Sequence, residues 1–280
     1  MSDNVQNPGS ALGEAIGYHL EIALNEYIEQ VAADYTCLLV STGKLNRKTN
    51  KPTKLLLYDD FGIPYNIDAV ITNSASQPLI LIEYKYIRYK KHNRDKGSWI
   101  CTAHSALRRS YNSVRSSIAI LAGSWSMSSL AMLKSNDINV FLIPFKRICD
   151  LLAVHGIDFN WGEKDRDIAL DSWARYSALS YQDKLAIAEE MIVGIKDQVE
   201  RSIQNTLDET IEREVAGVVL EIHTNIGEVK IFKFETISDA LDFLEDFTFE
   251  EIFDNANSFT LFNHPKTNTK FPKEDEEEET

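Results

Sequence analysis

The stretch LILIEYKYI, residues 79–87, decides the fold, because it forms an apolar strand-like run that carries two opposite charges. Successive side chains of a strand point to opposite faces of the sheet, so Glu83 and Lys85 share one face while Ile82 and Tyr84 share the other. A carboxylate in an apolar run is costly unless a cation or hydrogen-bond donors compensate it. The run therefore predicts a buried strand and, on one face of it, a candidate site.

Helices and further strands are expected on both sides of this run. Residues 10–31 carry apolar side chains at the i, i+3, i+4 spacing of an amphipathic helix, with Ser10 as its N-cap. Aliphatic runs between turn-forming residues predict the strands. The expected order is strands at 35–41, 53–60 and 66–73 before the run, then a helix near 98–113, a strand at 116–123, a helix near 127–134, a strand at 138–145 and a helix at 146–156. This order is typical of an α/β protein with a central mixed β-sheet flanked by helices.

The chain past residue 156 changes in character and is expected to extend the core. Residues 181–214 carry apolar side chains at helical spacing, which predicts one long helix or two stacked helices. A β-hairpin is expected around residues 224–227, followed by a helix at 237–247. The predicted organisation is a core over 1–156, a C-terminal helical and β-hairpin extension over 157–262, and a disordered acidic tail over 263–280.

The charges are distributed unevenly along the chain. The 29 Lys and Arg and 43 Asp and Glu give a net charge of −14, yet residues 1–150 hold 17 basic and 13 acidic residues. Nine of those basic residues fall between 85 and 115, where Asp95 is the one acid. Such a cluster favours a groove for a polyanion, although the same side chains could simply solvate a surface. The candidate positions are Lys90, Lys91, Arg94, Lys96, Arg108 and Arg109.

Neither a membrane span nor an export signal is expected. No apolar run reaches about 18 residues, and the N-terminal ten residues are polar. The three cysteines are far apart and form no C-x-x-C pair, which argues against a disulfide framework or a zinc site. A cytoplasmic protein is therefore predicted.

A second acid lies in the preceding apolar run, at Asp68 in residues 66–73. Asp68 and Glu83 from neighbouring strands could hold Mg²⁺, which prefers carboxylate oxygens, waters and phosphate oxygens. Lys85 would then orient a nucleophile or stabilise developing negative charge. The alternative is an exposed same-face pair of Glu83 and Lys85, with Asp68 as a polar residue at a strand edge.

The spacing of these residues resembles a known motif. Asp68, fourteen intervening residues and then Glu83-Tyr84-Lys85 resemble the D-x(n)-E-x-K signature of the PD-(D/E)XK nucleases, with Ile67 in place of the proline before the aspartate. The resemblance covers residues 10–145 and implies a restriction-endonuclease-like core, made of a helix, three strands, a helix and a further strand. It also implies catalytic roles for Asp68, Glu83 and Lys85, Mg²⁺ (or Mn²⁺) as cofactor, a further acid from the first helix, Glu21 or Glu14, and a phosphate contact from His104. The alternatives are that His104 is a histidine on the helix surface and that both helix acids are ordinary solvated residues.

The predicted function is therefore Mg²⁺-dependent hydrolysis of double-stranded DNA, by a sequence-specific type II restriction enzyme. A repair, recombination or mobile-element nuclease of the same fold, or a non-catalytic DNA-binding protein on a decayed nuclease fold, are the alternatives. A homodimer is expected, because one such site cuts one strand. The apolar stripe at 181–214 is a candidate dimer surface, and the alternative is that it packs against its own hairpin.

Overall fold

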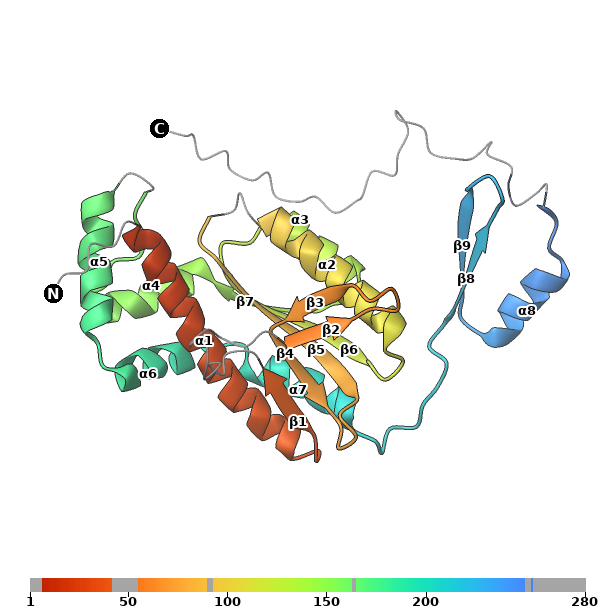
Figure 1. Ribbon diagram of the computed structural model, residues 1–280, viewed down its shortest axis with the longest axis horizontal. Helices are drawn as coiled ribbons and strands as arrows, with labels where there is room; N and C mark the ends of the chain where they lie inside the picture. Colours follow the sequence, from red (N-terminus) through yellow and green to blue (C-terminus); the bar gives the residue numbers. More distant parts are fainter. Residues whose placement is uncertain (1–6, 42–54, 90–92, 163–164, 250–252, 254–280) are drawn as a thin grey trace. The chain divides into compact units, whose positions relative to one another are not determined.

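The computed structural model describes residues 7–41, 55–89, 93–162, 165–249 and 253, and the chain divides into two compact units, Met1–Asp208 and Glu209–Thr280. The first unit is an α/β structure built on a five-stranded sheet, with helices on both faces (Figure 1). The predicted α/β class, with a central mixed sheet flanked by helices, is confirmed. None of the helices among the described residues combines the length and the apolar character that a membrane crossing requires.

The central sheet has the strand order β1-β4-β5-β6-β7. Its first three strands are antiparallel neighbours, whereas β5, β6 and β7 run parallel. The strands are β1 (Leu38–Ser41), β4 (Ala69–Thr72), β5 (Pro78–Ile87), β6 (Ser116–Gly123) and β7 (Asn139–Pro144). A separate hairpin, β2 (Leu55–Tyr58) and β3 (Pro64–Ile67), precedes β4. The run at residues 79–87 is therefore the middle strand, antiparallel to one neighbour and parallel to the other.

The two faces of β5 are covered by different helices. Ile80 and Ile82 pack in the core that contains α1 (Pro8–Ala33), whereas Leu81 packs with the buried side chains of α2 (Asn93–Ser110). Beside α2 lies α3 (Met127–Ser135), as Figure 1 shows. The alternating side chains of β5 therefore face two different hydrophobic cores. By this alternation, Glu83 and Lys85 lie on the face that α2 covers.

The first helix begins earlier than its sequence predicts. Asn7 is the N-cap, and its side chain accepts a hydrogen bond from the Ser10 amide at 3.0 Å. Pro8 occupies the first turn, where its missing N–H costs nothing. The predicted cap at Ser10 is therefore wrong by one turn, while the buried stripe that contains Leu12, Ile16 and other apolar residues of α1 agrees with the predicted periodicity.

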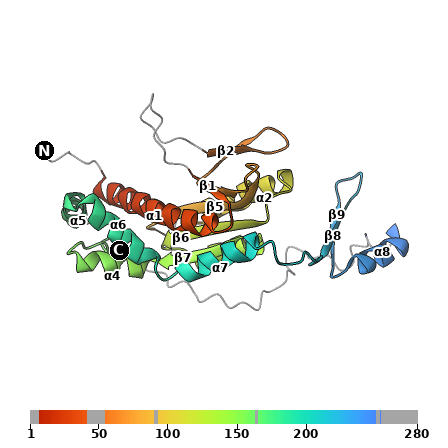
Figure 2. The same cartoon turned by 90° about the horizontal axis from the view of Figure 1, so that it is seen from below.

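The helices after residue 156 pack on α1 inside the first unit. After α4 (Phe145–Val154) come α5 (Arg166–Ala178), α6 (Tyr181–Ile192) and α7 (Lys196–Leu207), and Figures 1 and 2 show α5 and α6 beside α1. The predicted stripe thus forms two helices, and its Val199 and Ile203 have no exposed surface. The buried side chains of this stripe, up to Leu207, belong to the core of the first unit, so they are not available to join two chains.

The second unit contains the hairpin and helix that the sequence predicts. Strands β8 (Val218–His223) and β9 (Val229–Phe234) are joined by a turn in which Gly227 has a φ of 89°, a conformation that favours glycine. The aromatic ring of Phe243 in α8 (Ile237–Glu245) packs against Phe232 and Phe234, with ring centroids 4.6 and 5.2 Å apart. The predicted acidic tail over 263–280 lies outside the described residues.

Candidate active site

Asp68, Glu83 and Lys85 meet at the point where the chain enters the central sheet. Asp68 lies at a bend between β3 and β4, and Ala69 pairs with Ile82 of β5, so the antiparallel register brings residue 68 beside residue 83. The ammonium Nζ of Lys85 lies 2.8 Å from Asp68 Oδ2 and 2.6 Å from Glu83 Oε1. The two acids and the lysine that the sequence predicts as a site are therefore in direct contact.

Main-chain donors hold both carboxylates in place. The Tyr84 amide donates to Asp68 Oδ2 at 2.9 Å, and the Asp68 amide donates to Glu83 Oε2 at 3.4 Å. Each acid is thus bonded to the backbone next to the other acid. This arrangement fixes the carboxylates relative to the sheet, because neither side chain can rotate without losing a charge-assisted hydrogen bond.

The electrostatic balance of the three groups depends on burial. The Glu83 side chain is only 3 % exposed, and burial raises its pKa to about 7, against the opposing effect of the Lys85 cation. Burial lowers the pKa of Lys85, but the attraction of Glu83 and Asp68 outweighs it, so the net direction is upward. Lys85 is therefore a firmly charged cation, and the charge on Glu83 depends on having a positive group beside it.

The two carboxylates of the cluster are chemically suited to bind a hard divalent cation. Asp68 and Glu83 offer carboxylate oxygens, and Mg²⁺ is commonly held by one or two carboxylates plus waters and phosphate oxygens. A cation at these oxygens would also compensate the buried charge of Glu83. Among the residues that the structure describes, however, no group of three or more His, Cys, Asp or Glu side chains is placed to hold a metal. The protein would thus contribute two ligands, and Lys85 competes for both.

The acids of the first helix lie beside this cluster to different degrees. Glu21 and Glu14 both line a cavity of about 270 Å³ that also contains Lys85 and Tyr84. Glu21 is half-buried, and its charge is among the influences that raise the pKa of Tyr84, after burial of that phenol. Glu14 is exposed and lies nearer the N-terminus of α1. Of the two first-helix acids, Glu21 is therefore the one whose charge acts on Tyr84, the residue between Glu83 and Lys85.

His104 is placed differently from its prediction. The side chain is 1 % exposed, and neither ring nitrogen has a hydrogen-bond partner among the described residues. Burial, followed by the Lys85 and Arg108 charges, lowers its pKa to about 3, so the ring is neutral at pH 7. The predicted contact with a DNA phosphate does not fit a ring enclosed between α2 and the sheet, because no phosphate can reach it there.

The predicted DNA-contacting residues are partly on the surface of α2. Arg94, Lys96 and Arg109 are exposed. Arg108 is half-buried and donates to the Asp137 carbonyl at 3.3 Å, which connects α2 to the segment before β7. Lys90 and Lys91 lie outside the described residues.

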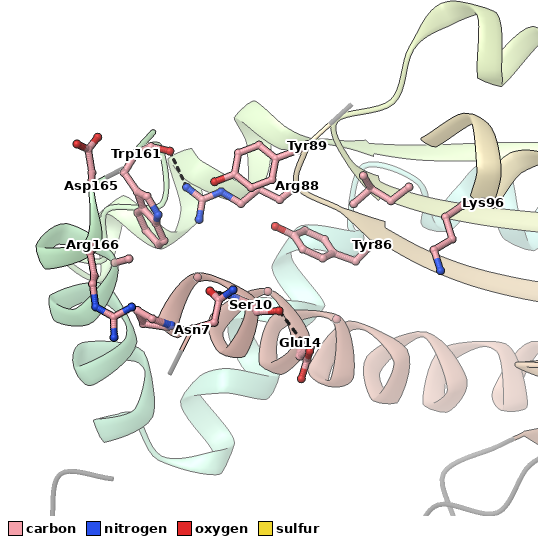
Figure 3. Close-up of a pocket in the computed structure, with 16 residues that line it drawn as sticks. Asn7, Ser10, Glu14, Tyr86, Arg88, Tyr89, Lys96, Trp161, Asp165 and Arg166 are labelled. Carbon is pink, nitrogen blue, oxygen red and sulfur yellow. Dashed lines mark hydrogen bonds between the residues drawn. The ribbon is translucent and has the colours of Figure 1, made fainter. Parts of the chain in front are cut away.

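A larger cavity, which adjoins the one beside Lys85, was not predicted from the sequence. Arg88, at the end of β5, contacts Trp161 from a segment 73 residues further along, and both line a cavity of about 820 Å³ (Figure 3). The available signal was a lone arginine after a buried strand, and its partners could not be read from spacing. This cavity shares Glu14, Gly17 and Tyr86 with the smaller one beside Lys85, so the two adjoin.

Comparison with known proteins gives no assignment. No known protein family matches the chain, and no curated protein matches it. A crystal structure described as "Protein of Unknown Function AF1548" aligns with 65 % of this chain and 99 % of its own, at 9 % sequence identity and a TM-score of 0.30. A likeness at that score supports no statement about fold family or function.

Proposed function

We propose that the protein is a Mg²⁺-dependent nuclease that hydrolyses phosphodiester bonds in double-stranded DNA, with a restriction-endonuclease-like core. The observation that carries the proposal is the contact of Lys85 Nζ with Asp68 at 2.8 Å and with Glu83 at 2.6 Å on adjacent strands. Two carboxylates and a lysine in a half-buried site match the needs of phosphodiester hydrolysis, which are a bound cation, an activated water and a positive group at the phosphate.

The order of elements supports the same family. A helix (α1), three antiparallel strands (β1, β4 and β5), a helix (α2) and a parallel strand (β6) follow one another along the chain, with the hairpin β2-β3 inserted before β4. This is the order that the resemblance to PD-(D/E)XK nucleases implies. Asp68 directly precedes the second strand of that series and Glu83 lies on the third, in the order that the motif implies.

The residues have distinct roles in the proposed mechanism. Asp68 and Glu83 would hold the cation, and Glu21, on the wall of the cavity that contains Lys85, would be the further acid from α1 without being a direct ligand. A bound Mg²⁺, or Mn²⁺ in its place, supplies an acidified water and positive charge beside the phosphate. Lys85, whose three N–H groups are arranged by the two carboxylates, donates a hydrogen bond to a non-bridging phosphate oxygen or orients the attacking water.

The substrate class follows from the cations of α2. Arg94, Lys96 and Arg109 are exposed side chains of one helix next to the site, and phosphate contacts of this kind provide sequence-independent affinity for DNA. A type II restriction enzyme is the proposed class. Cutting both strands would require two such sites, so we propose a homodimer that associates through a surface other than the buried 181–207 stripe.

A non-catalytic DNA-binding protein on the same fold is the second candidate. It is favoured by one observation, namely that Lys85 neutralises both acids within the described residues while no third acid joins them in a metal cluster. Such a protein would bind DNA through the same cations without cleaving it.

A cleavage assay on supercoiled plasmid distinguishes the nuclease from the non-catalytic DNA-binding protein. The purified chain is incubated with plasmid in Mg²⁺ or EDTA, beside Glu83→Gln, Lys85→Met and the control Lys146→Met, which removes an exposed cation from α4. We expect Mg²⁺-dependent nicking or linearisation by the wild type and the control alone. DNA binding without cleavage by the wild type would favour the second candidate, and activity equal to wild type in both site variants would refute the site.

A further inference from the structure

The larger cavity beside the cluster has the properties of a binding pocket. It measures about 820 Å³ and lies between the N-terminal turns of α1, the end of β5 and the segment around Trp161 (Figure 3). Pockets of this size hold a small ligand, or a single nucleotide of a longer nucleic-acid chain. Its continuity with the cavity beside Lys85 means that a chain-like substrate could occupy both.

Arg88 is fixed in the wall of this pocket. Its Nη2 donates to the carbonyl oxygens of Phe159 at 3.1 Å and Trp161 at 2.8 Å. The guanidinium carbon lies 3.8 Å from the Trp161 ring centroid and 4.7 Å from that of Phe159. Two hydrogen bonds and two aromatic rings restrict the guanidinium. The side chain therefore loses little further conformational entropy when it binds a ligand.

Arg88 makes no salt bridge with a carboxylate among the described residues, although Asp158 is near enough to favour its charge. Its Nε and Nη1 are buried and have no hydrogen-bond partner, and no described carboxylate lies within ion-pair distance. Burial lowers the pKa of Arg88, the direction expected when a cation lacks a close anion. By contrast, Arg175 on the surface pairs with Asp171 at 2.7 Å. A buried arginine with two unused donors is stable chiefly where an anion can come close to it.

The rest of the lining agrees with an anion. The side chains of Lys96 and Arg166 are exposed cations on the lining, and the phenol of Tyr86 is a further buried group with no hydrogen-bond partner among the described residues. Two acids also line the pocket. Asp165 accepts the Gly162 amide at 2.9 Å, and Glu14 accepts the Ser10 hydroxyl at 3.4 Å.

A glycine leaves room next to the arginine. A Cβ added at Gly9, in the first turn of α1, would lie 3.7 Å from Arg88 Nη1, which is an ordinary contact distance. A side chain at this position would therefore occupy pocket space beside the guanidinium without a backbone clash. The helix terminus itself adds the positive end of a 26-residue helix dipole to the same pocket.

We infer that this pocket binds a phosphate group of the nucleotide that neighbours the cleaved bond, with Arg88 as the buried cation and Tyr86 and Tyr89 as walls for the sugar or base. The inference rests on the proposed function for its substrate class. A planar guanidinium can donate hydrogen bonds to the oxygens of a tetrahedral phosphate, and aromatic walls suit a nucleoside better than a bare ion.

The test measures binding and not cleavage. Titration calorimetry in EDTA with thymidine 5′-monophosphate, thymidine and inorganic phosphate is performed on wild type, Arg88→Met, Gly9→Leu and the control Gly194→Leu, where an added Cβ meets nothing within 4 Å. We expect the nucleotide to bind wild type and control alike, and both pocket variants about tenfold or more weakly, as loss of a charge-assisted contact implies. Gly9→Leu keeps the arginine side chain itself, so it remains informative if Arg88→Met fails to fold.

The outcomes separate this inference from the proposed function. Equal nucleotide binding by wild type and Gly9→Leu, or no binding by wild type, would overturn the pocket assignment whatever the plasmid assay shows. Nucleotide binding that Gly9→Leu abolishes, in a protein that never cleaves DNA, would retain the pocket and reject the nuclease. Weaker binding of thymidine than of its monophosphate is required, because the inference assigns the pocket to phosphate.

Discussion

The Lys85 ammonium lies 2.6 Å from the carboxylate of Glu83, whose side chain is only 3 % exposed. The pair is held on one strand, two residues apart, in the interior of a mixed sheet. Each charge is therefore stabilised chiefly by the other and by Asp68. This dependence makes the consequences of removing one partner predictable.

Replacing Lys85 with methionine should destabilise the protein most at high pH. Without the cation, burial raises the pKa of Glu83 further above its unfolded value. A carboxyl whose folded pKa is raised binds more protons when folded, so stability falls as pH rises from about 4.5 towards and through that higher pKa. Breaking a buried pair costs about 3–5 kcal/mol, and we expect a loss of this order at pH 8 and a smaller one at pH 5, measured by urea unfolding.

The double variant Lys85→Met, Glu83→Gln is the control for that prediction. It removes both charges and should recover most of the stability at pH 8, because no buried carboxylate remains without a partner. If the single and double variants were equally unstable at pH 8, packing of the lysine stem and not its charge would explain the loss.

Mg²⁺ should stabilise the Lys85→Met variant more than the wild type. In the variant a divalent cation has no ammonium to displace from Asp68 and Glu83, and it supplies the missing positive charge. We expect a Tm increase with millimolar Mg²⁺ that is larger in Lys85→Met than in wild type and absent from Lys85→Met, Glu83→Gln. Equal increases in all three proteins would mean that the cation binds elsewhere.

His104 provides a prediction about acid stability. Its folded pKa of about 3 lies below the ordinary value of 6.5, so the unfolded chain takes up a proton that the folded ring does not. Through this residue, the free energy of unfolding therefore decreases as the pH falls below about 6.5. The slope is near 1.4 kcal/mol per pH unit, the value for one proton.

His104→Leu should remove that contribution while keeping the site buried. Its stability relative to wild type is expected to rise on going from pH 7 to pH 5, in urea unfolding curves of both proteins. His155→Leu, at an exposed histidine, is the control substitution. A constant difference between His104→Leu and wild type over this range would contradict a neutral buried ring.

The salt dependence of DNA binding tests the surface of α2. Arg94 and Arg109 are exposed, so replacing both with glutamine should lower the slope of log K against log salt by about one unit per lost phosphate contact. Lys146→Gln, which removes an exposed cation from α4, is the control. Arg108 is bonded to the Asp137 carbonyl, so Arg108→Gln should affect stability as well as DNA affinity. An unchanged slope in the double variant would place the DNA on another surface.

The sequence predicted the sheet and the cluster for the same reason. An apolar run with alternating faces identifies β5, and a charge in such a run is rare enough to mark a site, so Asp68, Glu83 and Lys85 could be named together before their contact was known. After residue 156 the helical periodicity of 181–214, the hairpin and the last helix could be predicted, because these patterns are local, whereas α5 and the division between α6 and α7 were not.

What the sequence could not supply was the packing partner of each element. The stripe on α6 and α7 is equally apolar whether it meets α1, its own hairpin or a second chain, and the structure assigns it to the core. His104 similarly reads as a surface residue from spacing alone, and only the position of α2 on the sheet encloses it. The Arg88 pocket depends on Trp161, and no local pattern connects residues so far apart.

The buried stripe gives a final prediction, which concerns folding and not assembly. Val199 of α7 has no exposed surface and packs in the core with α1, whereas Val193, in the turn between α6 and α7, is 59 % exposed. Val199→Glu places a carboxylate in an apolar core and should unfold the protein or leave it aggregated, while Val193→Glu should remain folded with near-wild-type stability. Circular dichroism with light scattering distinguishes the cases. A soluble, folded Val199→Glu protein of half the wild-type mass would show that the stripe joins two chains after all.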